Sequence, residues 1–125
     1  MQIEIKGRGV PVTDDLRRHT ERRLAKVSRQ VSELARLEIE LRREPNRRVA
    51  DREIAEATLY LKGVTLRACE ASPQISHSVN LVIEELSRQV KRRRVAVRRR
   101  RKTRAALSAR LGRAFGGSAS QPAVE

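Results

Sequence analysis

The chain has 125 residues and a formal net charge of +14, and its aromatic side chains are one tyrosine and one phenylalanine. This length allows one domain and a tail. So few aromatic rings argue against base-stacking platforms, which need several of them. One cysteine excludes an intramolecular disulfide, and no apolar run is long enough to span a bilayer. We expect a polyanionic partner, and nucleic acid is the obvious one.

The N-terminal part of the sequence predicts a strand followed by a helix. Residues 2–6 alternate between polar and apolar side chains, which indicates a short half-buried strand, broken at residues 7–9. Thr13 is a favourable N-cap, and two aspartates follow it in the first helical turn. The helix has a basic outer face and one apolar stripe, formed by Leu16, Thr20, Leu24, Val27, Val31 and Leu34.

Three further strands are predicted by alternation, over residues 37–42, 54–62 and 64–70. A charged loop over residues 43–52 separates the first two, and Lys62-Gly63 turns the chain between the last two. These short connections favour an antiparallel meander. The helix between the first and second strands favours a right-handed parallel crossover instead.

A second helix is predicted from Ser72-Pro73 onward. Its apolar stripe consists of Ile75, Val79, Val82, Ile83, Leu86 and Val90. Past Val90 the stripe fades but helix formers continue, so we expect the helix to project its basic last turns beyond the sheet. Residues 112–125 are rich in glycine and serine and are expected to be disordered.

The resulting prediction is an α+β domain over residues 1–104 with a flexible tail over residues 105–125. The element order is β-α-β-β-β-α, with a four-stranded sheet and two helices packed on one face. Positive charge is concentrated near the C-terminal end. Thirteen of the 26 residues from Arg88 to Arg113 are basic and none is acidic, whereas residues 1–90 carry only +3.

Other charged or reactive residues favour structural roles. Five arginines in and around the 43–52 loop stand beside acidic residues, so local pairing is the main expectation for Arg42, Arg43, Arg47, Arg48 and Arg52. The two histidines lie on different predicted helices without a ligand cluster, and Cys69 has no nucleophile signature. No glycine-rich phosphate loop occurs. We therefore expect no enzymatic activity, no cofactor and no metal.

Several segments resemble the ribosome hibernation-promoting factor family, which includes the ribosome-associated inhibitor called protein Y. An older name is sigma-54 modulation protein. The resemblance covers roughly residues 1–102, and its motifs are Met1-Gln2-Ile3-Glu4-Ile5-Lys6-Gly7, Val12-Thr13-Asp14-Asp15-Leu16-Arg17, Leu24-Ala25-Lys26-Val27, Leu66-Arg67-Ala68-Cys69-Glu70 and Leu86-Ser87-Arg88-Gln89-Val90-Lys91-Arg92. It matches the short form, without the C-terminal domain by which long forms are understood to pair ribosomes. At the start of the second helix, Ser76 and Asn80 replace a tyrosine and an aspartate usual in the family.

The resemblance implies a cytoplasmic translation inhibitor that binds the 30S subunit and its 16S rRNA. It would occupy the mRNA and tRNA channel near the decoding centre and silence or protect ribosomes in stress or stationary phase. No membrane or small-molecule partner is implied, and we expect a monomer off the ribosome. Basic positions that match the family are Arg17, Arg23, Lys26, Arg88, Lys91 and Arg92. The basic face of the first helix adds Arg22, and composition alone adds Arg94, Arg98, Arg99, Arg100, Arg101 and Lys102.

Two alternatives remain open at this point. One is a transcription modulator bound to DNA or RNA polymerase, as the older family name suggests, although no helix-turn-helix reader is predicted. The other is a non-specific polyanion binder that uses only the basic C-terminal residues. An anionic membrane is a weaker partner for that region, because Val90, Val95 and Val97 form only a thin apolar face.

Overall fold

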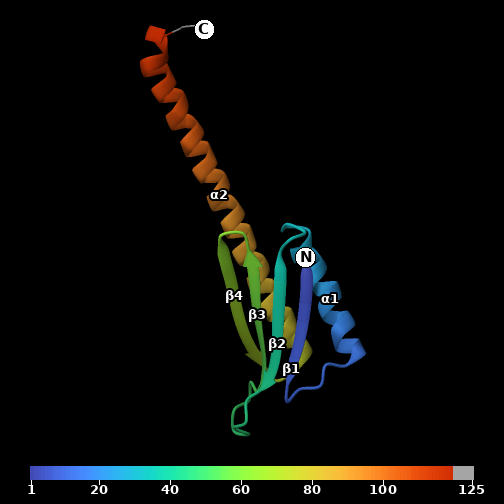
Figure 1. Ribbon diagram of the computed structural model, residues 1–125. Coiled ribbons are helices and arrows are strands. Elements are labelled where there is room, and N and C mark those ends of the chain that lie inside the picture. The colour runs from blue at the N-terminus through green and yellow to red at the C-terminus, as the bar shows by residue number, and fades with distance from the viewer. Residues whose placement is uncertain (120–125) are drawn as a thin grey trace. The chain divides into compact units, whose positions relative to one another are not determined.

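A computed structural model describes the backbone of residues 1–119 and the side chains of residues 1–112. The elements are β1 (Gln2–Arg8), α1 (Asp14–Ser28), β2 (Arg36–Arg43), β3 (Glu53–Leu61), β4 (Val64–Ser72) and α2 (Ile75–Ala119) (Figure 1). The predicted α+β class and element order are confirmed. The chain divides into two compact units, Met1–Lys91 and Arg92–Glu125, and α2 contributes to both.

The sheet has the strand order β1-β2-β3-β4. The first pair is parallel, with Ile5 opposite Ile39, and the other two pairs are antiparallel, with Ala57 opposite Ile39 on one side and Ala68 on the other. The predicted meander and the parallel pairing across the first helix are therefore confirmed. A two-residue turn closes the β3–β4 hairpin, and Gly63 adopts a φ of 79° there, which favours glycine.

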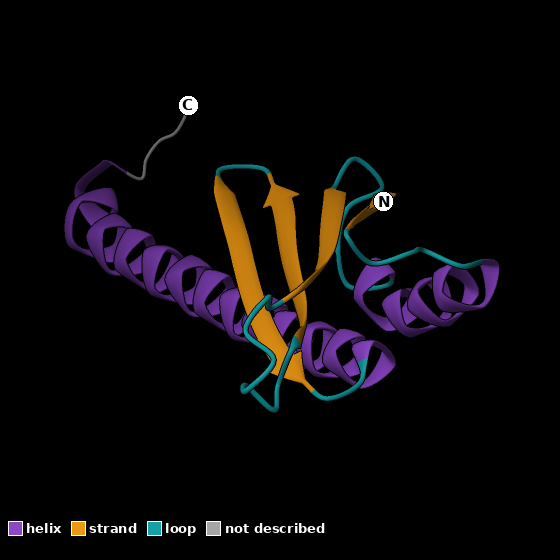
Figure 2. Ribbon diagram, turned by 90° about the horizontal axis from the view of Figure 1, so that it is seen from below, coloured by secondary structure: helices purple, strands orange, loops and turns teal. Residues whose placement is uncertain are grey.

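The core lies between one face of the sheet and the two helices. Figures 1 and 2 show α1 and the N-terminal part of α2 on the same side of the strands. Alternate strand residues point into this layer, where they meet the stripes of both helices. The largest fully buried side chains are aliphatic, namely Leu24, Leu37, Ile39, Leu41, Leu59, Ile83 and Leu86. Each such side chain contributes about 1.5–3 kcal/mol through burial, which fixes the helices on the sheet.

The first strand is longer than the alternation indicated. It continues through Gly7 and Arg8, so the expected break at residues 7–9 is wrong for these two positions. Gly7 lies opposite Leu41 in the parallel ladder, and a Cβ at this position would overlap the carbonyl oxygen of Val10. Glycine is required here by the close approach of the returning chain, and the turn itself begins at Gly9.

The start of α1 follows the prediction. Thr13 is the N-cap, and its Oγ1 accepts a hydrogen bond from the backbone N–H of Leu16 at 3.2 Å. Asp14 and Asp15 occupy the first turn, where negative charge is favourable for the helix dipole. Residues at the start of this helix therefore set its position in the chain.

The end of α1 comes earlier than the apolar stripe indicated. The helix ends at Ser28, Val31 is half-buried, and Leu34 is 94% exposed, so its assignment to the stripe is wrong. Ser32 turns the chain, because its Oγ accepts from the N–H of Leu34 at 3.1 Å and its carbonyl accepts from the N–H of Ala35 at 3.0 Å. Once the chain leaves the helix, the 3.6-residue spacing no longer places side chains on one face.

The second helix begins at Ile75 and continues to Ala119. Its predicted stripe is confirmed, because the five positions from Val79 to Val90 are at most 2% exposed. The helix runs into the segment for which the sequence predicts a flexible tail and, from residue 112, disorder. Alanine, leucine and arginine between residues 104 and 111 are good helix formers, and the helix continues past Gly112. Residues 120–125 lie outside the described part of the chain, and flexibility over residues 105–125 stays a prediction.

Candidate nucleic-acid interface

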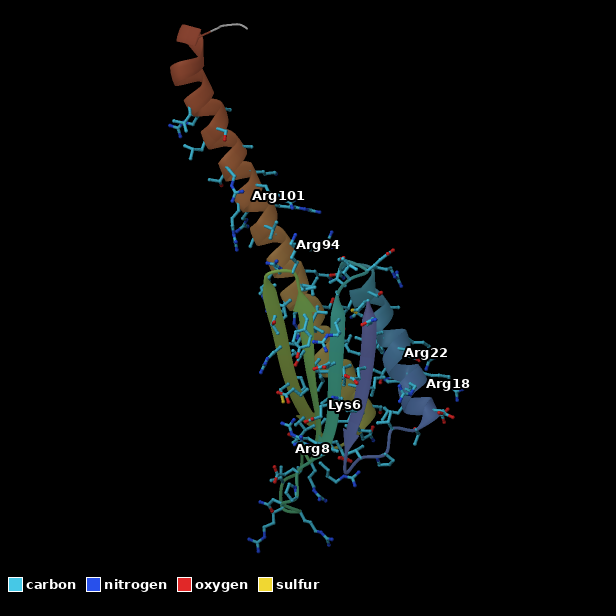
Figure 3. All side chains as sticks on the ribbon, in the orientation of Figure 1. Lys6, Arg8, Arg18, Arg22, Arg94 and Arg101 are labelled. Atoms are coloured by element: carbon cyan, nitrogen blue, oxygen red, sulfur yellow. The ribbon has the colours of Figure 1, made fainter. Side chains whose placement is uncertain are left out.

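The side of α1 that faces away from the sheet is lined with cations. The helix buries Leu16, Thr20, Leu24 and Val27, and the buried Thr20 hydroxyl donates to the carbonyl oxygen of Leu16 at 2.8 Å. The remaining circumference carries Arg17, Arg18, Arg22, Arg23 and Lys26. Figure 3 shows Arg18 and Arg22 projecting from α1 on the side away from the strands. A polyanion can therefore reach these guanidinium groups without disturbing the core.

Within the first unit, α2 adds basic residues beside its buried stripe. Arg88 and Lys91 are exposed. Leu86, two residues before Arg88, and Val90, just before Lys91, are buried. Two acids, Glu84 and Glu85, precede the basic positions by one turn. Arg88 Nε donates to Glu85 Oε1 at 3.2 Å, and its Nη1 lies 3.9 Å from Glu84 Oε2. The last turns of this part of α2 thus present a surface of mixed charge, with two acidic and two basic residues.

An ion pair joins the two helices. Lys26 Nζ lies 3.1 Å from Glu84 Oε1, and both side chains are about half exposed. The pKa of Glu84 is lowered by its hydrogen bond with Lys26 and then by the charges of Lys26, Arg88 and Arg23. Glu84 therefore remains ionised and is surrounded by cations from both helices. Basic residues that are about 60 positions apart in sequence form one surface around it.

A second polar contact lies further toward the helix N-termini. His19 Nε2 and Asn80 Oδ1 are 2.8 Å apart, with both side chains half-buried. Going from His19 to Lys26 on α1, the partner on α2 changes from Asn80 to Glu84, which is also later in the sequence. The two helices α1 and α2 therefore run parallel. Asn80 is one of the two positions at which the start of the second helix departs from the family pattern. Its side chain lies in the contact between the helices.

Within the first unit, the structure brings five of the six predicted positions on α1 and α2 together. Arg22 and Arg23 lie within about 60° of Lys26 around α1, whereas Arg17 lies roughly 180° away, on the opposite flank of the helix. We define the helix-pair surface by the basic residues that lie on the shared side of α1 and α2, namely Arg22, Arg23, Lys26, Arg88 and Lys91. Arg17 is exposed but is not part of this surface.

The opposite face of the sheet is also charged, but its charges are paired. Among the described strand residues, the carboxylates of this face are Glu4, Glu38, Glu40 and Glu56, and each has a cationic partner within 4.0 Å. Arg36 also stacks over the Tyr60 ring at 4.2 Å from its centroid, and Tyr60 donates to Glu38 at 3.1 Å. Because the carboxylates of this face already engage its cations, fewer charges are available for phosphate, so the helix side is the better nucleic-acid surface.

The loop arginines mostly pair locally, as the sequence predicts. Arg43 makes three hydrogen bonds of 2.7–3.1 Å with the Glu53 carboxylate, and this pairing lowers the Glu53 pKa. Arg42 pairs with Glu56 at 3.0 Å, and Arg52 Nε donates to the Glu44 carbonyl oxygen at 3.1 Å. These three arginines stabilise the β2–β3 connection rather than form a free cationic patch.

The second unit carries the remaining predicted positions on α2. Arg94 and the run from Arg98 to Lys102 are exposed. Arg92 is exposed and has interactions of its own. Figure 3 marks Arg94 and Arg101 along this helix. The two acids that modulate the helix-pair surface, Glu84 and Glu85, were missed at the sequence level, although their position one turn before Arg88 is the spacing of helical ion pairs.

Among the described residues, no group of three or more histidine, cysteine, aspartate or glutamate side chains could hold a metal ion. A search of the same residues finds no helix with the length and apolar character needed to cross a membrane. Cys69 is a free and exposed thiol on β4. The charged helix side is therefore the most distinctive chemical feature of the part of the molecule that the structure describes.

Comparisons with known proteins agree with this fold. A ribosome hibernation promotion factor from Picosynechococcus sp. is 29% identical over 93 residues, which are 74% of this chain and 48% of that relative. The chain thus spans about half the length of the relative. The crystal structure of the Thermus thermophilus Protein Y N-terminal domain superposes with a TM-score of 0.62 at 26% identity, covering 74% of this chain and 98% of that chain.

A ribosomal subunit interface protein from Coxiella burnetii has the same fold, with a TM-score of 0.62 at 22% identity over 76% of this chain and 99% of that chain. The family described as Sigma 54 modulation protein / S30EA ribosomal protein matches residues 3–98. This region contains the sheet except for Gln2, together with α1 and the first turns of α2. The chain belongs to the Sigma 54 modulation protein / S30EA ribosomal protein family.

Proposed function

We propose that the protein inhibits translation by binding the small ribosomal subunit through its helix-pair surface. The bound domain lies in the mRNA and tRNA channel near the decoding centre and excludes both ligands, which silences or protects ribosomes in stress or stationary phase. The action is steric and needs no catalytic residue or cofactor. The partner is the 30S subunit with its 16S rRNA, and the protein acts in the cytoplasm as a monomer off the ribosome.

The observation that carries this proposal is the convergence of cations from α1 and α2 around the Lys26–Glu84 ion pair. The two parallel helices hold these cations on a rigid surface. Their buried side chains Leu24, Val27, Leu86 and Val90 anchor both helices in the core. Phosphate groups bind such arginines through charge-assisted hydrogen bonds. The relatives are named as a ribosome hibernation promotion factor and a ribosomal subunit interface protein, which indicates rRNA as the source of the phosphates.

The proposal is tested by reversing charge on one face at a time. The variant Arg22→Glu/Arg23→Glu changes two exposed positions of the helix-pair surface, and Lys6→Glu/Arg8→Glu changes two exposed positions on β1 (Figure 3). Co-sedimentation with 30S and 70S particles and inhibition of translation in vitro are measured for both. We expect the first variant to lose at least about ten-fold in affinity and its inhibition, because attractive phosphate contacts become repulsive. The second should resemble wild type.

Salt dependence gives an independent measure of the phosphate contacts. With about six phosphates neutralised, log K should fall against log salt with a slope of roughly −4 to −5. A flat dependence would exclude phosphate-driven docking. Sedimentation of the protein with nucleoid or RNA polymerase rather than ribosomal particles would favour transcription modulation. Unchanged inhibition by Arg22→Glu/Arg23→Glu would show that the family fold is present here without this docking mode.

A further inference from the structure

The α2 segment from Arg92 to Gly112 is an independent cationic element. It contains ten arginines and lysines and no acidic residue. It belongs to the second compact unit, whereas the helix-pair surface belongs to the first, and it is helical throughout. Its distribution of charge around the helix axis therefore indicates the shape of the polyanion that fits it.

Cations surround this helix on all sides. The run from Arg98 to Lys102 has five consecutive basic residues, all of them exposed. Successive residues of an α-helix are separated by about 100°, so five consecutive positions leave no gap wider than about 100° around the axis. Docking on a flat phosphate surface needs cations on only one side of a helix. A full ring of cations fits a site with phosphates on several sides.

We propose that this segment binds inside a groove or channel of folded RNA whose phosphates contact the helix from at least two sides. The proposal rests on the proposed function, because it takes ribosomal RNA as the polyanion, and it adds a second contact that is distinct from the helix-pair surface. Phosphate positions, not base edges, are recognised, because arginines that point in all directions make the same charge-assisted contacts with any sequence.

The apolar residues of the segment argue against insertion into a membrane. Leu107 and Leu111 are 54% and 50% exposed and are one turn apart. Arg100 and Arg104 precede them by seven residues each and lie within about 20° of them around the axis. An interfacial helix needs an apolar side free of charge. Here, Arg100 and Arg104 lie on the same side of the helix as the two leucines, so this side is not free of charge.

Charge repulsion within the segment gives the interaction a spectroscopic signature. Arg94, Arg98 and Lys102 follow one another at four-residue spacing, and Arg100 and Arg104 do the same. Like charges at this spacing destabilise a helix, and bound phosphates remove the repulsion. We therefore expect the far-UV circular dichroism of the full chain to show increased helix content when a structured RNA binds, beyond the sum of the separate spectra.

The experiment compares three double variants with equal loss of charge, each on a different side of the helix. They are Arg94→Gln/Arg101→Gln, Arg99→Gln/Lys102→Gln and Arg100→Gln/Arg104→Gln, and all six positions are exposed. Affinity for factor-free 70S ribosomes is measured by co-sedimentation over a series of salt concentrations. The matched control is Lys6→Gln/Arg8→Gln, which removes two charges from β1. Vesicles that contain phosphatidylserine serve as the second probe.

Binding in a groove predicts that at least two of the three variants lose affinity and that the salt slope of each such variant becomes shallower by roughly 1.5, the value for two phosphates. The control should retain the wild-type slope. Loss confined to one variant would overturn the proposal, since it would show one-sided docking. Binding to the vesicles that exceeds binding to ribosomes at equal salt would also overturn it, in favour of a lipid surface.

The outcomes also separate this inference from the proposed function. If Arg22→Glu/Arg23→Glu abolishes ribosome binding while none of the three helix variants has an effect, docking of the domain holds and the groove contact is wrong. If two or three of these variants weaken binding and Arg22→Glu/Arg23→Glu does not, the groove contact holds and the helix-pair surface is wrong. A wild-type chain that does not bind ribosomes would exclude both.

Discussion

Lys26 Nζ and Glu84 Oε1 lie 3.1 Å apart, although 58 positions separate these residues in the sequence. The contact places one carboxylate in the middle of the helix-pair surface. Phosphate must compete with it for Lys26 and for Arg88, whose Nη1 lies 3.9 Å from the other Glu84 oxygen. Glu84 therefore limits the affinity of a surface that is otherwise arranged to bind RNA.

Replacement of this carboxylate should strengthen binding. We expect Glu84→Gln to raise ribosome affinity about two- to five-fold at moderate ionic strength, because both cations become available and a repulsive charge is removed. The salt slope should become steeper at the same time. Co-sedimentation titrations at several salt concentrations measure both quantities.

The matched control is Glu21→Gln, an exposed acid on α1 that lies about 140° from Lys26 around the helix. It removes the same charge without touching the contact between the helices. A gain for both variants would mean that overall charge alone matters. A loss for Glu84→Gln would show that the carboxylate orients Lys26 for binding rather than competing with phosphate.

The Arg43–Glu53 pair should make stability depend on acid pH. Hydrogen bonding with Arg43 lowers the pKa of Glu53 below its ordinary value of 4.5. Its contribution is therefore fully present above the unfolded-state pKa and is lost as the pH falls through the folded-state value. We expect Glu53→Gln to reduce Tm at pH 7 and to have a smaller effect at pH 3. Thermal unfolding from pH 3 to 7 checks this, with Glu33→Gln, an exposed acid outside the strands, as control.

A buried serine connects the start of α2 to the sheet. Ser78 Oγ donates to the Glu53 carbonyl oxygen at 2.6 Å and lies 2.7 Å from Ser72 Oγ, and its side chain is fully buried. Ser78→Ala leaves buried acceptors without their partner, so the free energy of unfolding should fall by about 1–3 kcal/mol. Urea unfolding measures the change. The exposed Ser76→Ala, two residues earlier, should have almost no effect, and equal losses would contradict the role of burial.

The first compact unit should fold without the second. A chain that ends after Lys91 retains every strand, α1 and the buried stripe of α2. We expect a cooperative thermal transition, with loss of helical circular dichroism limited to the missing turns, and a markedly lower affinity for ribosomes. Loss of the cooperative transition would show that the basic segment supports the fold. Unchanged affinity would show that it does not contact RNA.

Periodicity predicted the elements well, because it is a local property. Strand alternation gave the inward positions such as Leu37 and Leu59, and helical spacing gave Leu24 and Leu86. The same rule failed at Leu34, because periodicity does not indicate where a helix ends, and Ser32 turns the chain there. The extra strand residues at Gly7 and Arg8 depend on pairing with β2, which the local sequence does not reveal.

The candidate site was predicted only in part for a related reason. The charge pattern identified the cations of both helices, and the resemblance singled out six of them, Arg17, Arg23, Lys26, Arg88, Lys91 and Arg92. It could not show that Arg17 lies on the far flank of α1, since that depends on which side of α1 faces α2. The contacts His19–Asn80 and Lys26–Glu84 require the relative register of two helices, which is set by core packing and is not encoded in any short segment.

The parallel pairing of β1 has a consequence for the order of folding. Gln2 on β1 pairs with Arg36 on β2, and the whole of α1 lies between these two residues in the sequence. The β2–β3 and β3–β4 pairings join strands that are closer together in the sequence. Closing the longer loop costs more chain entropy, so we expect the meander to form first. Ile5→Ala should then mainly accelerate unfolding, while Leu59→Ala in the central hairpin should slow refolding, as stopped-flow kinetics can measure. The strand that is synthesised first is thus expected to join the sheet last.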